Sequence, residues 1–339
     1  MAKKRVVWID IVKLYACILV VLGHFFMGLV GSNILPSGFC FNLFKNSIYT
    51  FHVPLFFICS GYLHQKYTNE KNLNDALNNR LKKLLVLGVP YFFFSTVTWA
   101  IKFVFSSISG DKVDSLITSL FVQPLSPYWY LYILFFMFLI TPVLNGKKSI
   151  YVFVAALIMK ILTFFPLNIN IYLIDKLLEH EIWFVLGMML CSFSIPERLK
   201  GKLPLIFGIL CGALFIGSCF YLLNYGYFFI IGLLACISTI IIAINIQHNK
   251  IIIKLSEISS IYTLPVFLMH SIFAAALRTL LIKLGVYLAP IHIILGLIIA
   301  IGGPMIAAWI MDKIKYMDFV MYPNKYIKIG KKPKGENNG

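Results

Sequence analysis

The chain has 339 residues, of which 60% are apolar and only 13% are charged, and its formal net charge is +17. Soluble domains average about 45–50% apolar and about 25% charged residues, so this composition excludes a soluble globular fold. The excess of basic residues indicates membrane topology and attraction to anionic lipid headgroups rather than nucleic-acid binding, because it is concentrated in short clusters between apolar stretches.

The apolar stretches are long enough to cross a membrane. Each has roughly 17 to 25 residues, which spans about 30 Å of hydrocarbon as a helix. Helices are required because backbone polar groups must be paired internally in lipid. We therefore predict an all-α membrane protein, a polytopic bundle of about ten transmembrane helices. Its spans are expected near residues 8–30, 44–63, 84–106, 128–144, 150–165, 182–195, 203–222, 227–246, 258–281 and 286–311.

The basic residues predict how this bundle is oriented. Lysine and arginine are retained in cytoplasmic loops, whereas acidic residues have little influence. If the N-terminal cluster is cytoplasmic, alternate loops carry most of the 30 basic residues on that side. We expect both termini in the cytoplasm and the protein in the inner or plasma membrane as a multi-pass protein. The few basic residues then left in outer loops are Lys45, Lys112, Lys176, Arg278 and Lys283.

One membrane domain accounts for nearly the whole chain. We assign it to residues 1–322, followed by a basic cytoplasmic tail over 323–339 that we expect to be disordered. The first apolar segment is not a secretory signal, because its core carries Asp10 and Lys13. The cysteines lie mostly in spans, and no Cys-x-x-Cys or Cys/His metal spacing occurs, so we expect neither disulfides nor a metal site.

Polar residues inside predicted spans are candidates for function, because each is costly in lipid unless it is paired or faces a cavity. In the first span Asp10, Lys13, Cys17 and His24 share one face, since eleven residues rotate a helix by a net of about 20°. That face would line a polar space. In a purely structural alternative, Asp10 and Lys13 form an ion pair and His24 bonds to a neighbouring helix.

Two further histidines have a comparable predicted depth. His52 precedes Pro54 in the second span, and His270 shares a face with Ser259 in the ninth. A lone buried histidine is usually structural. Three imidazoles at related depth, those of His24, His52 and His270, favour one shared cavity.

Several short motifs, in order, resemble membrane acyltransferase family 3 in its stand-alone membrane form. The segment from Ile9 to His24 resembles the opening motif of that family, and Phe56 to Tyr62 resembles its F-F-x-x-S-G-[YF] signature. Lysines at 13 and 83 replace arginines that are usual in the family, so bidentate phosphate contacts are lost there while positive charge is kept. The remaining motifs are Arg80-Leu81-Lys82-Lys83, Trp129-Tyr130-Leu131, and Ser260-Ile261-Tyr262 running to His270.

The resemblance implies transfer of an acyl group, usually acetyl from acetyl-CoA, to a hydroxyl of a cell-surface or lipid-linked sugar. His24 is then the leading general base, and His270 is an alternative base or a group that polarises the thioester carbonyl. Asp10 would orient Lys13. Ser60 fits a helix-packing hydroxyl better than a nucleophile. The expected substrate and CoA contacts are Arg80, Lys82, Lys83, Ser60, Tyr62, His52, Trp129 and Tyr262.

The expected partners are the bilayer, acyl-CoA as donor substrate, a saccharide or lipid-linked glycan, and proteins of cell-envelope glycan biosynthesis. No cofactor is expected to be permanently bound. The stand-alone domain would complete the transfer itself or pass the acyl group to a partner. A glycan carrier or exporter is the alternative function, since the same polar residues could line a transport path. A structural membrane subunit is a third reading.

Overall fold

The structure, a computed structural model, describes residues 5–68, 73–109, 112–144, 146–165, 169–225 and 229–329. Every regular element within these ranges is helical. The helices are α1 (Val7–Gly31), α2 (Phe39–Tyr67), α3 (Leu73–Ser109), α4 (Trp129–Ile140), α5 (Ser149–Leu162), α6 (Tyr172–Ser192), α7 (Ile195–Arg198), α8 (Lys202–Tyr225), α9 (Phe229–Ile246), α10 (Lys250–Lys283) and α11 (Ala289–Lys313), with short helical turns η1 (Thr118–Val122), η2 (Gly146–Lys148), η3 (Met317–Val320) and η4 (Pro323–Lys325).

Length and composition confirm an all-α membrane protein. Six helices, α1, α3 and α8 to α11, are long and apolar enough to cross a bilayer. Each of the ten predicted spans overlaps one helix, and α7 is an additional short one. The number of ten spans and the cytoplasmic position of the termini remain predictions.

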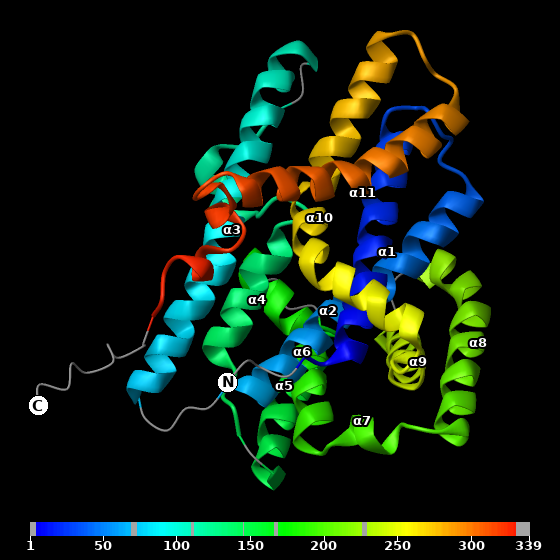
Figure 1. Cartoon of the computed structure of the whole chain (residues 1–339). Helices are drawn as coiled ribbons and strands as arrows, with labels where there is room; N and C mark the ends of the chain where they lie inside the picture. Colours follow the sequence, from blue (N-terminus) through cyan, green and yellow to red (C-terminus); the bar gives the residue numbers. More distant parts are fainter. Residues whose placement is uncertain are drawn as a thin grey trace, which may run out of the picture.

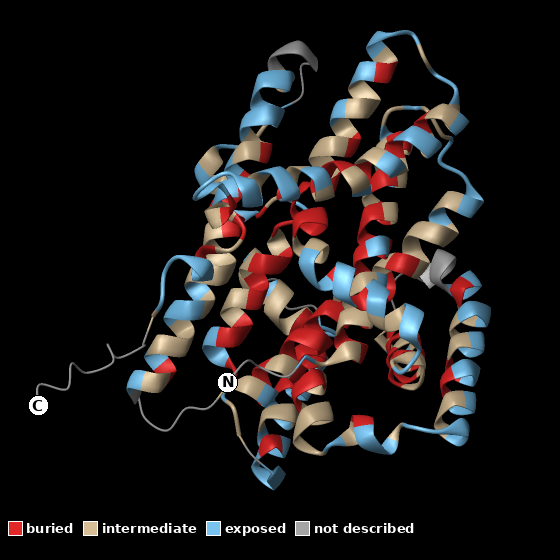
Figure 2. Cartoon of the chain, in the orientation of Figure 1, coloured by how far each residue is buried: buried red, intermediate tan, exposed pale blue. Residues whose placement is uncertain are grey.

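Helices α2 and α6 are less hydropathic than the six candidate membrane-spanning helices, because both carry polar residues that face protein. His52, His64 and Gln65 are buried in α2, and His180 and Glu181 are buried in α6. These two helices lie near the centre of the molecule with α1 and α4, where buried residues concentrate (Figures 1 and 2). By contrast, α8 on the periphery exposes a series of large apolar side chains, as a lipid-facing helix does.

A reciprocal pair of glycines brings α2 and α6 into backbone contact. A Cβ on Gly61 would lie 1.8 Å from the carbonyl oxygen of Phe184. A Cβ on Gly187 would lie 1.9 Å from the carbonyl oxygen of Ile58. Small residues allow this kind of close packing between membrane helices. The glycine of the Ser60-Gly61-Tyr62 motif therefore fixes the spacing of two central helices.

The chain after α11 folds back onto the membrane domain. Segments η3 and η4 pack against α3 and α11, as Figure 1 shows at the red end of the chain. Lys325 forms ion pairs with Asp318 at 2.6 Å and with Asp312 at 2.9 Å. The predicted disordered tail is therefore folded at its start, over 323–325. Residues 330–339 lie outside the described part of the chain.

Candidate active site: two chambers and an aromatic wall

Two cavities adjoin one another in the middle of the bundle. The first, which we name the histidine chamber, has a volume of about 210 Å³. Helices α1, α2, α4, α5, α6, α9 and α10 contribute to it. Its polar and aromatic lining residues are His24, Tyr49, Thr50, His52, Phe56, Ser126, Trp129, Tyr130, Lys160, Lys176, Glu179, His180, Trp183, Phe229 and Phe267.

The second cavity, which we name the Lys13 chamber, has a volume of about 320 Å³. Small-molecule sites commonly have about 300–1,000 Å³, so this chamber is of ligand size. It brings Lys13 of α1 and Lys83 of α3 to the same space. The other polar groups on its lining are Asp10, Ser60, Ser259, Ser260 and Thr263.

Three aromatic side chains form the wall between the chambers. Phe56, Tyr130 and Phe267 line both cavities. Their ring centroids lie 5.6 Å apart for Phe56 and Tyr130, 5.8 Å for Tyr130 and Phe267, and 6.1 Å for Phe56 and Phe267. These separations fall in the contact range of aromatic pairs, about 4.5–7 Å. We refer to the three residues as the aromatic wall.

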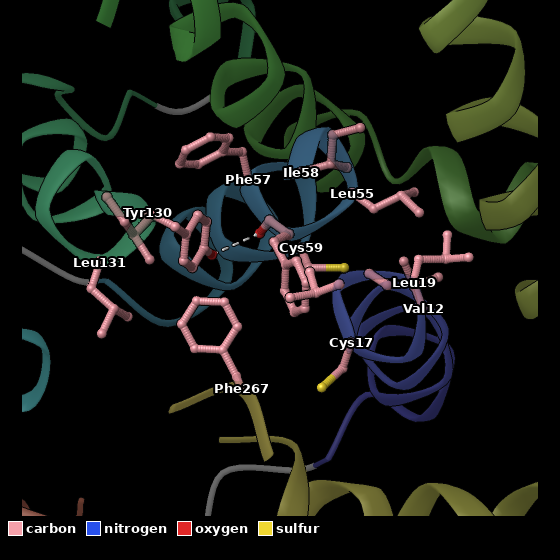
Figure 3. Close-up of a cluster of buried hydrophobic side chains, with 14 of the residues drawn as sticks. Val12, Cys17, Leu19, Leu55, Phe57, Ile58, Cys59, Tyr130, Leu131 and Phe267 are labelled. Atoms are coloured by element: carbon pink, nitrogen blue, oxygen red, sulfur yellow. Dashed lines mark hydrogen bonds between the residues drawn. The ribbon is translucent and has the colours of Figure 1, made fainter. Parts of the chain in front are cut away.

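Tyr130 is held in the wall by hydrogen bonds to α2. Its hydroxyl lies 3.0 Å from Ser60 Oγ and 3.3 Å from the carbonyl oxygen of Phe56. Figure 3 shows Tyr130 between Phe57 and Phe267. Ser60 thus shares its hydroxyl with a tyrosine, in agreement with the predicted packing role, while it also lines the Lys13 chamber.

His24 and His270 meet across the interface of α1 and α10, with ring centroids 5.4 Å apart. His270 is 1% exposed, and its Nδ1 lies 3.0 Å from the carbonyl oxygens of both Val266 and Phe267. Nδ1 must therefore carry the hydrogen, which leaves Nε2 as an acceptor in the neutral ring. Nε2 is buried and has no hydrogen-bond partner among the described residues.

The two roles predicted for His270 make different demands on Nε2. A neutral ring that donates through Nδ1 to backbone carbonyls offers Nε2 as a proton acceptor, as the role of alternative base requires. Polarisation of a thioester carbonyl requires an N–H at Nε2, and this role stays a prediction.

His52 has the same kind of bond, since its Nδ1 lies 2.7 Å from the carbonyl oxygen of Ile48. Its ring is 4.8 Å from that of Tyr49, which in turn lies 6.2 Å from His24. The structure thus brings the three predicted histidines to one site, with His24 and His52 on the lining and His270 directly behind His24.

Helix α6 contributes a charged cluster that the sequence analysis did not find. Glu179 Oε2 lies 2.7 Å from Lys176 Nζ and 3.5 Å from His180 Nε2. Lys160 of α5 approaches the Glu179 backbone carbonyl at 3.4 Å. The predicted sixth span begins at residue 182, which leaves these residues in a loop. The spacing of Lys176, Glu179 and His180 at i, i+3 and i+4 is the helical signal that could have placed them on one face.

The predicted partnership of Asp10 and Lys13 is wrong. Asp10 Oδ2 accepts a hydrogen bond from Arg5 Nε at 2.5 Å. Arg5 also donates to Ser256 Oγ at 2.8 Å and so ties α1 to α10. Asp10 and Lys13 both line the Lys13 chamber, yet Arg5 is the cation that neutralises the carboxylate. Sequence spacing favoured an i, i+3 pair, whereas Arg5 in the chain before α1 donates its Nε to Asp10 and its Nη2 to Ser256.

The remaining predicted residues divide between the chambers and other places. Trp129 lines the histidine chamber, with its ring 5.5 Å from that of His180. Lys83 lines the Lys13 chamber, with Nζ 3.8 Å from the centre of the Phe138 ring. Four predicted contact residues lie outside the lining of both chambers, namely Arg80, Lys82, Tyr62 and Tyr262.

Tyr62 packs edge-on against Trp8 at 5.1 Å and so serves the interface of α2 and α1. Lys82 is exposed on α3, in agreement with the alternative that it only follows the positive-inside rule.

Comparison with known proteins supplies the family. Residues 6–309 match the family described as an acyltransferase domain. The chain belongs to acyltransferase family 3. The family resemblance that the motifs indicated is thereby confirmed. The matched residues include all those that line the two chambers and form the aromatic wall.

Two curated relatives of this family member are nodulation proteins. The nodulation protein NolL of Mesorhizobium japonicum is 27% identical over 164 residues, which cover 48% of this chain and 42% of the relative. The protein of the same name from Sinorhizobium fredii is 31% identical over 145 residues, covering 41% of this chain and 37% of the relative. The aligned part is thus less than half of each relative. No solved structure matches this chain.

Proposed function

We propose that this family 3 protein is an integral membrane acyltransferase that moves an acyl group, in the simplest case acetyl, from acyl-CoA to a hydroxyl of a cell-surface or lipid-linked sugar. The observation that carries the proposal is the meeting of the two chambers at the aromatic wall, with Lys13 and Lys83 on the lining of one chamber and the imidazoles of His24 and His52 on the lining of the other.

The Lys13 chamber suits the donor. Lys13 and Lys83 provide positive charge for the phosphates of CoA, with Ser60, Ser259 and Ser260 as hydrogen-bonding groups. Because single lysines bind phosphate as point charges, they hold it less rigidly than an arginine fork. In the predicted topology this chamber opens toward the cytoplasm, where CoA is found.

The histidine chamber suits the acceptor and the chemistry. His24 accepts the proton of the sugar hydroxyl, whose oxygen attacks the thioester carbonyl. The new C–O bond forms and the C–S bond breaks, and CoA leaves as a thiol after taking the proton that His24 held. His270 Nε2 accepts a hydrogen bond from His24 in this scheme and keeps its ring oriented.

The aromatic wall separates the two substrates before reaction. The thioester end of the donor has to pass Phe56, Tyr130 and Phe267 to reach His24. Aromatic side chains there exclude water, which would otherwise compete with the sugar hydroxyl for the acyl group.

The test uses purified protein in nanodiscs with radiolabelled acetyl-CoA and a panel of alkyl glycosides. Wild-type protein should transfer label, and His24→Ala should lower transfer by about 10²–10⁴-fold, the usual contribution of a general base. His248→Ala is the matched control, because His248 is exposed in the turn between α9 and α10, outside the lining of both chambers. If His24→Ala transfers label as fast as wild type, His24 is not the base. Glycan movement across the membrane without CoA would favour a carrier instead.

A further inference from the structure

Arg278 lies in the interface of α1 and α10, beyond the histidine pair. On α10 it follows His270 by eight residues, a little more than two turns. On α1 it meets Gly28, which follows His24 by four residues on the same face, about 6 Å along the helix. The position that a Gly28 Cβ would occupy is 2.2 Å from Arg278 Nη1 and 3.1 Å from Cζ. The missing side chain at position 28 makes room for the guanidinium.

Among the described residues the guanidinium has no carboxylate or other hydrogen-bond acceptor in contact with it. Arg278 is half-buried between α1 and α10. A charged group in a membrane protein is costly unless it is paired or reaches water, so a half-buried guanidinium without a protein anion is a candidate binding site. It also keeps five donors in a fork that matches phosphate or carboxylate.

The charges on the lining of the histidine chamber also favour an anion. The histidine chamber has two ammonium groups, Lys160 and Lys176, and one carboxylate, Glu179, on its described lining. Lys176 is paired with Glu179 at 2.7 Å. The balance of fixed charge on this lining is therefore positive. Arg278 lies outside the lining and adds a further positive charge beside Gly28, about 6 Å along α1 from His24.

We propose that Arg278 binds an oxyanion carried by the acceptor, a phosphate or a carboxylate, and so holds the acceptor hydroxyl at His24. This inference rests on the proposed function and names the class of acceptor, an anionic glycan or glycolipid. A lipid headgroup is the competing source of the same chemistry. The acceptor is favoured over a headgroup because the guanidinium packs against Gly28, which lies on the face of α1 that carries His24.

The experiment measures equilibrium binding of three farnesyl probes to the full chain in phosphatidylcholine nanodiscs without acetyl-CoA. Farnesyl glucoside is neutral, farnesyl glucuronide carries a carboxylate, and farnesyl phosphoryl glucose carries a phosphate. Wild-type protein should bind at least one anionic probe about tenfold more tightly than the neutral probe, as expected for hydrogen bonds to a charged group. Arg278→Gln should abolish this preference, and Arg278→Lys should retain part of it.

Matched variants distinguish the effect of the guanidinium's position from a general effect on folding. Gly28→Ala keeps the arginine but displaces its guanidinium, and should lose the preference as well. Gly31→Ala, where nothing lies within 4 Å of the added Cβ, should behave as wild type. Arg198→Gln removes an exposed arginine from α7 and should also leave the preference intact.

Three results would overturn the proposal. The first is equal binding of the three probes by wild type, and the second is a preference that survives in Arg278→Gln. The third is an Arg278→Gln variant that loses only its affinity for added phosphatidylglycerol, which would assign the guanidinium to headgroups. Because no acyl donor is present, the outcome does not depend on whether acetyl transfer itself is observed.

Discussion

His24 of α1 and His270 of α10 lie with their ring centroids 5.4 Å apart, although 245 residues separate them in the chain. The second ring is fixed by two backbone carbonyls, and the first lines a chamber. A pair with one fixed and one accessible imidazole is suited to proton transfer.

His270→Asn tests this pair. The asparagine amide can still donate to the Val266 and Phe267 carbonyls, whereas the Nε2 acceptor is lost. We expect a fall in kcat of about 10²-fold or more, with little change in the KM for acetyl-CoA. Steady-state kinetics with labelled acetyl-CoA measure this split. A variant with wild-type kcat would mean that His270 only supports helix packing.

Lys83→Gln tests the donor site. Removal of an ammonium from the Lys13 chamber should raise the KM for acetyl-CoA by about tenfold, with a smaller effect on kcat. Lys83→Arg should keep most of the affinity. The neighbouring exposed Lys82→Gln is the matched control and should leave KM unchanged. Equal effects at positions 82 and 83 would point to general attraction of CoA to a basic surface.

Phe267→Ala tests the aromatic wall. Loss of this ring joins the two chambers, because Phe267 lines both of them. We expect the ratio of butyryl to acetyl transfer to rise by about tenfold and hydrolysis of acetyl-CoA without acceptor to increase, since water gains access.

Phe135→Ala is the control for the wall, because Phe135 belongs to α4 but lies outside the lining of both chambers. Thiol release with and without an acceptor provides the readout. Unchanged selectivity in Phe267→Ala would show that this wall does not limit passage of the acyl group.

Gly61→Ala tests the backbone contact of α2 and α6. The new Cβ would stand 1.8 Å from the Phe184 carbonyl oxygen, so the helices must separate. Overpacking costs about 1–3 kcal/mol, and here the neighbour is backbone that cannot turn away. We expect a lower melting temperature in detergent. Gly217→Ala on α8 meets nothing within 4 Å and should melt as wild type. Equal melting of the two variants would contradict the packing.

Asp318→Asn tests the fold of the chain after α11. Burial raises the pKa of Asp318, but hydrogen bonds from Lys325 and Tyr326 outweigh burial and hold it below its ordinary value. A depressed pKa in the folded state stabilises the fold above the ordinary aspartate pKa of about 3.9, and this stabilisation is lost as pH falls further.

At neutral pH, Asp318→Asn should therefore speed trypsin cleavage at Lys325 several-fold. Asp312→Asn is the control, since Asp312 is exposed and makes only the one contact with Lys325. Similar cleavage rates for wild type and Asp318→Asn would show that the ion pair does not hold this segment.

The sequence by itself determined the membrane class, the helical fold and the polar face of α1 that carries His24, because hydropathy and the 3.6-residue period are local properties. Ordered motifs were also enough to indicate the family. The placement of the sixth span was less accurate, because Glu179 and His180 interrupt its hydropathy while facing a chamber rather than lipid.

Only the tertiary structure decided which groups meet. It paired Asp10 with Arg5 and placed Tyr62 and Tyr262 outside the lining of both chambers. It also formed the aromatic wall from side chains of α2, α4 and α10. It also placed Arg278 over Gly28. These contacts join residues that are far apart in the chain, and they depend on how closely helix backbones approach, which no local pattern in a single sequence specifies.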